Sequence, residues 1–258
     1  MYLILDSYGT LVEMDDFYGR LYAGFTRLGI QATFEAVKKA ARREMKFYMS
    51  RARFAVDWPS YEKIRLECAC ELIASLREQN VRITASKEAI ARVLGESVVF
   101  RALPGARETL MVLKERGVRL GVVSNWDYRL AQALEETKLL PFFDFVLSSA
   151  QARSEKPGRE IFERGVEMAR RFVPNLKARD CFYVGDHYEK DVLGARSAGL
   201  RPLWLVAKER DVPSGEIHDA TDDVPRLRCL KDLLKLFGTG VEAENSVRSR
   251  HPERIEES

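Results

Sequence analysis

The chain has 258 residues, of which 46% are hydrophobic, so it can bury a sizeable core in one large domain or in a domain with an insert. Its 42 Lys and Arg residues nearly balance 39 Asp and Glu residues, which gives a formal net charge of +3. This balance argues against a protein that holds nucleic acid by neutralising phosphates over a wide basic face. No stretch of the sequence approaches the roughly 20 apolar residues that a membrane-spanning helix needs, so we expect no membrane partner either.

The cysteines suggest neither a metal site nor a disulfide framework. Cys68 and Cys70 are separated by a single residue, which is too close for a usual zinc-binding pair, and no Cys or His pair elsewhere completes such a site. The other two are Cys181 and Cys229. An apolar run begins directly after Met1 and leaves no room for a signal sequence. We therefore expect reduced thiols and a cytoplasmic location.

The first half of the chain combines one short apolar run with a long helical pattern. The run at residues 2–5 ends at the turn-forming residues 6–9 and predicts a buried strand. From about residue 15 to residue 95 the apolar residues recur at helical spacing, as in Phe17 and Leu21. Hardly any strand signal interrupts this stretch. It predicts a small helical domain inserted after the first strand.

From residue 103 onward the pattern changes to alternating helices and strands. Continuous apolar runs of this kind are typical of parallel strands that are buried on both faces. The predicted strands are 119–123, 143–147, 181–184 and 202–206, and the predicted helices are 106–116, 128–137, 160–170, 191–198 and 227–237. The predicted fold class is therefore α/β, with a doubly wound, mostly parallel, Rossmann-like sheet and an inserted helical cap.

These patterns divide the chain into three parts. We expect residues 1–12 and 97–237 to form the α/β core and residues 13–96 to form the helical cap domain. The remaining residues, 238–258, are polar with few bulky apolar side chains, and we expect them to be a disordered tail.

Polar side chains follow several of the predicted strands at the points where they end. Asp6 follows the first strand, Ser124 and Asn125 follow the second, and Asp186 follows the strand at 181–184; Lys156 comes after the third strand, just before a helix. In open parallel sheets, ligands bind beyond the carboxyl ends of the strands. Taken singly, the Asp, Asn and Ser residues among them could simply cap helices that follow strands. Together they predict an active site at one edge of the sheet.

These residues resemble the four sequence motifs of the haloacid dehalogenase superfamily. The matching segments are residues 4–11, residues 122–125, Lys156-Pro157, and residues 184–186 with Asp191. The resemblance covers about residues 1–237 and implies a cap domain between the first and second motifs. The segment from Val118 to Gly199 is similar to a eukaryotic branch, the haloacid dehalogenase-like hydrolase domain-containing protein 3 group.

The resemblance implies that Asp6 is a nucleophile, which splits one difficult displacement into two easier ones through a covalent ester. It also implies Mg²⁺ as cofactor, because a hard dication removes the repulsion between a carboxylate and a phosphate. The implied ligands are Asp6, the backbone carbonyl of Tyr8, and Asp186, while Asp191 would steady the water on the metal.

Further catalytic roles follow from the same resemblance. Ser124, together with Asn125 in the second motif, would bind an oxygen of the substrate phosphate, with help from amides at the start of the following helix. Lys156 would supply a compact positive charge among the gathered acids. Thr10 would orient the turn after the first strand and assist the acid–base step.

Tyr8 departs from the phosphatase pattern, in which a second Asp protonates the leaving alcohol and then activates water. The sequence Asp-x-Tyr-Gly-Thr-Leu is instead similar to the first motif of 2-haloacid dehalogenases, whose halide leaving group needs no proton. Asp186 and Asp191, however, match the metal-binding fourth motif of phosphatases. Three functions stay open: a phosphatase of a small phosphorylated metabolite, a 2-haloacid dehalogenase, and a weakly active or non-catalytic ligand-binding protein. All three bind a small molecule, and the oligomeric state stays open.

Aromatic residues in two places add weaker expectations. We expect the cap residues Phe47, Tyr48, Phe54 and Trp58 to form mainly the core of the cap. Trp126 and Asp127 directly follow the second motif and could line the entrance to the site, and His187 is expected to be a loop residue beside Asp186.

Overall fold

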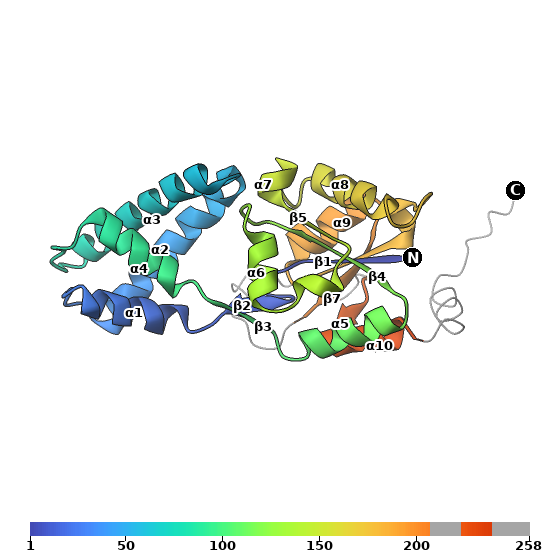
Figure 1. The fold of residues 1–258 in the computed structure, drawn as a ribbon, viewed down its shortest axis with the longest axis horizontal. Coiled ribbons are helices and arrows are strands. Elements are labelled where there is room, and N and C mark those ends of the chain that lie inside the picture. Colours follow the sequence, from blue (N-terminus) through green and yellow to red (C-terminus); the bar gives the residue numbers. More distant parts are fainter. Residues whose placement is uncertain (207–222, 239–258) are drawn as a thin grey trace, which may run out of the picture.

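The computed structural model describes residues 1–206 and 223–238 of the chain (Figure 1). Apart from Gly238, the tail predicted for residues 238–258 lies outside these residues. The described part contains a parallel sheet covered by helices and, beside it, a group of helices (Figure 1). Within the described ranges, no helix is both long and apolar enough to cross a lipid bilayer.

The sheet is parallel throughout, and its strand order is β5-β4-β1-β6-β7-β8. The strands are β1 (Tyr2–Leu5), β4 (Arg119–Ser124), β5 (Phe145–Ser148), β6 (Cys181–Gly185), β7 (Arg201–Leu205) and β8 (Arg226–Leu227). The first strand is central, since Leu5 pairs with Val122 on one side and with Val184 on the other. This arrangement brings the carboxyl ends of β1, β4 and β6 to one edge and confirms the predicted α/β fold class.

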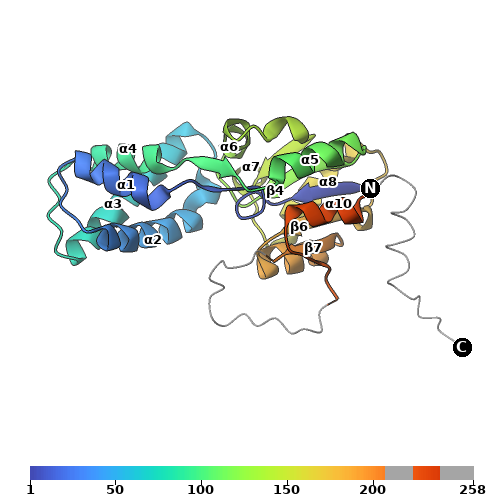
Figure 2. The same ribbon diagram turned by 90° about the horizontal axis from the view of Figure 1, so that it is seen from below.

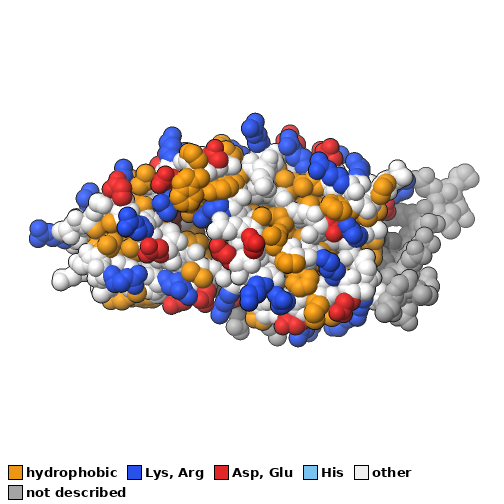
Figure 3. Space-filling view, viewed as in Figure 1, with side chains coloured by type: hydrophobic (Ala, Val, Ile, Leu, Met, Phe, Trp, Pro, Cys, Tyr) orange, Lys and Arg blue, Asp and Glu red, His pale blue; other side chains and the backbone are white. Residues whose placement is uncertain are grey.

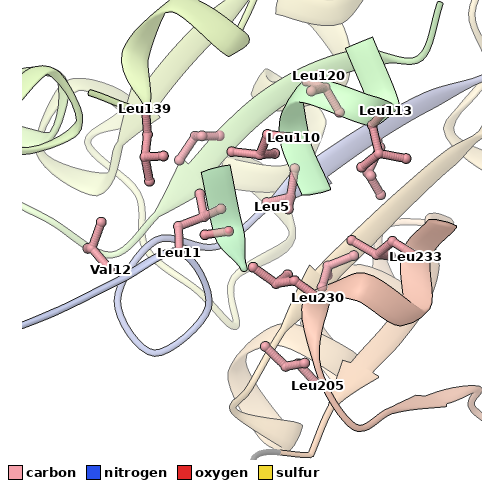
Figure 4. Packing of buried hydrophobic residues seen from close by; sticks show 14 of the residues in the cluster. Leu5, Leu11, Val12, Leu110, Leu113, Leu120, Leu139, Leu205, Leu230 and Leu233 are labelled. Carbon is pink, nitrogen blue, oxygen red and sulfur yellow. The ribbon is translucent and has the colours of Figure 1, made fainter. Parts of the chain in front are cut away.

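Helices cover both faces of this sheet (Figure 2). One face packs against α5 (Ala106–Glu115), α6 (Leu130–Glu136) and α10 (Leu233–Leu236), and the other against α7 (Ser149–Ala152), α8 (Arg159–Arg170) and α9 (Gly194–Ser197). Successive strand residues point to opposite faces. Leu3 and Leu5 therefore join the leucine-rich cluster of the first face (Figure 4), while Tyr2 and Ile4 join the cluster of the second.

Residues 17–97 form the second group of elements. The helices are α1 (Phe17–Arg27), α2 (Phe34–Arg51), α3 (Trp58–Glu78) and α4 (Lys87–Ser97), with a short 3-10 turn at Ala52–Phe54. Each α-helix is preceded by a residue whose side chain accepts a hydrogen bond from a backbone amide in the first turn of that helix. The four residues are Asp16, Thr33, Asp57 and Ser86. Their apolar stripes bury a hydrophobic cluster of their own. We call this group the cap.

A two-stranded antiparallel ribbon lies where the chain passes between the sheet and the cap. Its strands are β2 (Val12–Met14) and β3 (Phe100–Ala102). The ribbon was not predicted, because three-residue strands carry too few residues to show alternation. The predicted domain limit of 12/13 falls within β2, and that of 96/97 falls at the last residues of α4; both stay a prediction.

Two predicted helices differ from the structure. The helix expected at 191–198 instead starts as a π-helix at Tyr188–Leu193 and continues as α9. The helix expected at 227–237 begins as an edge strand, β8, followed by a 3-10 turn at Leu230–Asp232 and the four-residue α10. The strand forms because β7 offers free backbone groups at the edge of the sheet, and this tertiary pairing overrides the helical pattern.

The prediction that four aromatic residues form mainly the core of the cap is wrong for two of them. Phe54 and Trp58 are 52% and 53% exposed. Phe54 lies in the 3-10 turn, where the guanidinium of Arg53 lies 4.7 Å from its ring centroid, and Trp58 is the first residue of α3. At these positions a side chain lies at the end of a helix rather than on its buried stripe.

Over the face of the molecule in Figure 3, Lys and Arg side chains are mixed with Asp and Glu, as the balanced composition indicates.

The cap core also contains a carboxyl group. Glu44 on α2 is 5% exposed, and the thiol of Cys68 on α3 donates a hydrogen bond to it. Burial raises the pKa of Glu44 to about 7, and the thiol offsets only part of this shift. In the unfolded chain this carboxyl group has an ordinary pKa near 4.5. Between these pH values the folded protein holds a proton that the unfolded chain releases, so the free energy of unfolding falls as the pH rises.

We therefore expect Glu44→Gln, which cannot ionise, to be more stable than the wild type above pH 7, by up to about 3 kcal/mol. Near pH 4.5 the two proteins should be almost equally stable, because the wild-type carboxyl group is then protonated in the folded state. Urea unfolding at pH 4.5 and pH 8 measures both differences. Glu135→Gln on the exposed face of α6 is the matched control. A stability difference that does not change with pH would contradict this account of Glu44.

Candidate active site

The loop after β1 holds Asp6 at the carboxyl edge of the sheet. The amide of Asp6 donates to the carbonyl of Val184 at 2.8 Å, which continues the pairing of β1 with β6. The carbonyl of Ser7 then accepts hydrogen bonds from the amides of residues 10, 11 and 12, so the loop folds tightly on itself. Gly9 has a φ of 87°, in the left-handed region that favours glycine. The Asp6 residue is 7% exposed and fixed by this backbone.

The ammonium group of Lys156 connects the buried polar residues at this edge. It donates to Asp6 Oδ1 at 2.7 Å, to Asp191 Oδ1 at 2.5 Å and to the hydroxyl of Tyr183 at 2.9 Å. The hydroxyl of Ser124 donates to the same Oδ1 of Asp6, also at 2.7 Å. One oxygen of Asp6 thus has two donors, while the other accepts no hydrogen bond from the described part of the chain.

The electrostatics of this cluster follow from its burial. Burial lowers the pKa of Lys156, but the combined attraction of Asp191 and Asp6 outweighs this and raises the pKa above its ordinary value. Lys156 is therefore charged at neutral pH. Burial also raises the pKa of Asp191, an effect that the nearby Lys156 opposes and Asp6 reinforces. An ammonium group among carboxylates in such a site removes part of the cost of burying them.

The side chain of Asn125 positions Lys156 by binding the backbone of that lysine. The side-chain amide of Asn125 donates to the carbonyl of Lys156 at 2.9 Å, and its carbonyl oxygen accepts from the Lys156 amide at 2.8 Å. This pair of hydrogen bonds connects the end of β4 to the segment before α8. The structure thus gives Asn125 a positioning contact with Lys156.

Three carboxylates converge beside Lys156. Oxygen atoms of Asp6, Asp186 and Asp191 lie within 4.8 Å of one another. Carboxylate oxygens are hard ligands, and Mg²⁺ takes a few of them together with water. The donor set fits a divalent cation of this kind.

Asp191 reaches this cluster from the π-helix that follows β6. A Cβ atom at Gly185 would lie 2.2 Å from the carboxyl carbon of Asp191, so only glycine leaves room for this approach. The amide of His187 donates to Asp191 Oδ2 at 2.9 Å. π-Helical turns of this type often occur at functional sites. The imidazole of His187 accepts from the Lys190 amide, in keeping with the expected loop role.

Tyr8 and Thr10 differ in their surroundings. Tyr8 is 41% exposed, lines the cavity described below, and has its ring centroid 6.4 Å from that of Trp126. Thr10 is fully buried, and its hydroxyl has no hydrogen-bond partner within the described residues. The structure thus places Tyr8 at the site. The contact by which Thr10 was predicted to orient the turn is not seen for its hydroxyl within the described residues.

A cavity of about 540 Å³ opens from this edge of the sheet toward the cap. Asn125 and Lys156 line its core end, while α2 and α3 line its cap end. Its volume falls in the range that accommodates small-molecule ligands. Trp126 lines it as expected. Lys156 is both a cavity residue and a direct partner of Asp6, so a ligand here lies beside the carboxylate cluster.

Sequence reasoning missed contacts that join the cap to the core. The hydroxyl of Tyr48 on α2 donates to Asp127 Oδ2 at 2.5 Å, and the guanidinium of Arg129 contacts the same oxygen at 2.8 Å. Arg129 also lies 3.6 Å from the ring centroid of Tyr61 on α3. Asp127 is fully buried, so these partners compensate its charge. Tyr48 was expected mainly in the cap core, and Asp127 at the entrance.

Tyr183 was also missed, although it contacts Lys156 directly. Its hydroxyl donates to the carbonyl of Val123 at 2.7 Å and accepts from Lys156. The signal available in the sequence was a hydroxyl-bearing residue in an otherwise apolar strand, two positions before Gly185.

Comparisons with known proteins agree with this geometry. The family of haloacid dehalogenase-like hydrolases matches residues 2–199. The haloacid dehalogenase-like hydrolase domain-containing protein 3 of Bos taurus is 35% identical over 138 residues, which are 54% of this chain and 51% of that protein. The pyrimidine 5'-nucleotidase YjjG of Escherichia coli (strain K12) is 32% identical over 137 residues, 53% of this chain and 58% of that protein. The chain thus spans about half the length of these relatives.

Solved structures share the fold over most of the chain. The putative HAD-hydrolase YfnB of Bacillus subtilis, bound to magnesium, has a TM-score of 0.64 and 17% identity, and covers 92% of this chain and 98% of its own. The L-2-haloacid dehalogenase RSc1362 has a TM-score of 0.62 and 20% identity, with 92% and 97% covered. The expected resemblance to the domain-containing protein 3 branch is confirmed by the bovine match. The chain belongs to the haloacid dehalogenase-like hydrolases.

Proposed function

We propose that this hydrolase is a Mg²⁺-dependent phosphatase that acts on a small phosphorylated metabolite in the cytoplasm. The observation that carries the proposal is the cluster of Asp6, Asp186 and Asp191, whose carboxylate oxygens lie within 4.8 Å of one another. Such a donor set suits a divalent cation, which would offset the negative charge of a phosphate. The four cysteines are free thiols, in keeping with that location.

In the proposed reaction a carboxylate oxygen of Asp6 attacks phosphorus. The bond from phosphorus to the alcohol oxygen breaks, the leaving oxygen takes a proton from solvent water, and an aspartyl phosphate ester remains on Asp6. Water then attacks this phosphorus and releases inorganic phosphate and the carboxylate. Ser124 and Lys156 hold one carboxylate oxygen of Asp6 throughout, and the other is left for attack. Positioning of this kind supplies much of the catalysis of phosphoryl transfer.

Asp6, Asp186 and the backbone carbonyl of Tyr8 would hold the Mg²⁺ ion, and Asp191 would orient its water. The ion would neutralise charge on the phosphate oxygens. Two comparisons support the proposal of a magnesium-dependent phosphatase. One relative is named as a nucleotidase, and one structural neighbour is described as bound to magnesium.

A second candidate function rests on Tyr8. A phenol with its ordinary pKa near 10 transfers protons poorly at neutral pH, whereas a halide needs no proton to leave. A 2-haloacid dehalogenase with Asp6 as nucleophile would therefore tolerate Tyr8, and dehalogenases are among the structural neighbours. A weakly active or non-catalytic ligand-binding protein is the third candidate, since it too would lack the acid at this position.

The metal assignment predicts binding of Mg²⁺ in the low-millimolar range or tighter. At a concentration ten times the dissociation constant, Mg²⁺ should raise the free energy of unfolding by about 1.4 kcal/mol. Calorimetry and thermal unfolding with added MgCl₂ measure the two effects. Asp186→Ala should lose both, whereas Glu189→Gln, an exposed acid in the neighbouring π-helix, should keep them. Wild-type protein that shows neither heat nor stabilisation would remove Mg²⁺ from the proposal.

The phosphatase assignment predicts a gain of activity from Tyr8→Asp. General acid–base catalysis is typically worth about 10²–10⁴-fold, so hydrolysis of an alkyl phosphate should rise steeply toward this range. Aryl phosphates should gain less, because their leaving groups depart without a proton. Asp6→Asn should abolish both activities, and Tyr8→Asn is the matched control that lacks the acid. The measurement is kcat/KM for both ester types with Mg²⁺ present.

Two outcomes separate the phosphatase from the dehalogenase, and a third tests the role of Tyr8. A gain confined to Tyr8→Asp supports the phosphatase. Dehalogenation of 2-haloacids by the wild type, lowered by Tyr8→Asp, supports the dehalogenase, because an added acid beside Asp6 raises its pKa and weakens its attack. A wild type that is already fast on alkyl phosphates, and is slowed by Tyr8→Asp, would show that another residue supplies the proton.

A further inference from the structure

The walls of the cavity indicate what part of a substrate can lie there. Most of the lining is apolar, and much of it is aromatic or methionine, as in Met14, Phe17, Met45, Phe100 and Trp126. The hydroxyl groups of a sugar or polyol would lose their hydrogen bonds to water against such walls without replacement. Flat aromatic rings lose little on entering and gain contacts with other rings and with thioether sulfur.

Most charged side chains that line the cavity are already paired. Arg129 contacts the buried Asp127, Arg53 pairs with Glu155, and Lys156 is held by the carboxylates of the site. These groups are compensated within the protein and need no ligand.

Two side chains at the cap end differ from these. Glu44 is 95% buried, with only the Cys68 thiol as hydrogen-bond partner among the described residues. The Nε atom of Arg65 is buried and has no hydrogen-bond partner there, and the guanidinium reaches Glu62 only at 3.8 Å. Arg65 is also flanked by aromatic rings, at 5.9 Å from the ring centroid of Tyr61.

Glu44 on α2 and Arg65 on α3 both line the cap end of the cavity. Cys68 contacts Glu44 and lies three residues after Arg65 on α3, so Arg65 and Cys68 share one face of that helix. Both Glu44 and Arg65 line the cavity. A carboxyl group can accept an N–H and a guanidinium can donate to a carbonyl oxygen. A ligand with an N–H beside a C=O on one edge would satisfy both.

We propose that the substrate is a phosphomonoester whose alcohol carries a heteroaromatic ring, and that the ring presents an N–H and C=O edge to Glu44 and Arg65. The inference rests on the proposed phosphatase function for the phosphate end. The ring occupies the apolar part of the cavity, and the phosphate lies at Asp6. Glu44 and Arg65 determine specificity, since an edge that lacks these groups would give no hydrogen bond to the Glu44 carboxyl group or to the buried Nε atom of Arg65.

Uridine 5'-monophosphate and ribose 5-phosphate differ only by such a ring, so they are the probes for hydrolysis with Mg²⁺ present. We expect kcat/KM to be at least about 10-fold higher for the nucleotide, in line with discrimination by a hydrogen-bonding site. Methylating N3 of the ring removes the N–H and should cancel most of this preference. Arg65→Met and Glu44→Met should lower the ratio of the two kcat/KM values, because a methionine side chain replaces neither the donor nor the acceptor. Arg77→Met, on the exposed side of α3, is the control and should leave the ratio as it is.

A second measurement separates this inference from the phosphatase proposal. Uridine, which has no phosphate, should bind to Asp6→Asn protein in calorimetry, and Arg65→Met should weaken that binding about 10-fold. Uridine binding without hydrolysis of any ester would support the ring site and reject the phosphatase. Ester hydrolysis with no preference for the nucleotide and no uridine binding would reject the ring site and leave the phosphatase in place. A nucleotide preference that both variants retain would also overturn the assignment of Glu44 and Arg65.

Discussion

The ammonium group of Lys156 lies between the carboxylates of Asp6 and Asp191, and the geometry of the candidate site depends on this charge pairing. Without a counter-charge, carboxylates buried this deeply would ionise only at a considerable cost in free energy. The pairing therefore allows the carboxylates to be buried and charged together. It also explains the contacts around it. Asn125 fixes the backbone of Lys156, and the Tyr183 hydroxyl accepts a further hydrogen bond from the ammonium group. These positions come from four separate segments of the chain, which only the parallel sheet brings together.

Much of the fold could be predicted from the sequence because its signals are local. The strands that end at Asp6, Ser124 and Asp186 are continuous apolar runs followed by polar residues, and a parallel sheet aligns their ends. The weaker predictions concern features decided by distant partners. The edge strand β8 forms because β7 is there to pair with it, and the ribbon strands are too short to show a pattern.

The candidate site shows the same division between local and distant signals. Its acids, serine and lysine were found from the motifs, which also placed them at one edge. Glu44 was missed because it lies in a highly charged stretch of α2, where most such side chains are solvated. Its burial is decided by packing against Cys68 on α3, and no local pattern records that contact. Tyr183 was hidden in the same way, as one residue of a strand whose other members are apolar.

The paired strands β2 and β3 have a consequence for how the cap and the core stay associated. Both passages of the chain between the two parts run through this ribbon, whose three-residue strands span only about 10 Å. Such a tether keeps the two halves of the cavity at a high effective concentration relative to each other. Assembly of the complete cavity is therefore a unimolecular event. Its equilibrium depends on contacts between the two parts, such as those of Tyr48 with Asp127 and of Arg129 with Tyr61, and dilution of the protein leaves it unchanged.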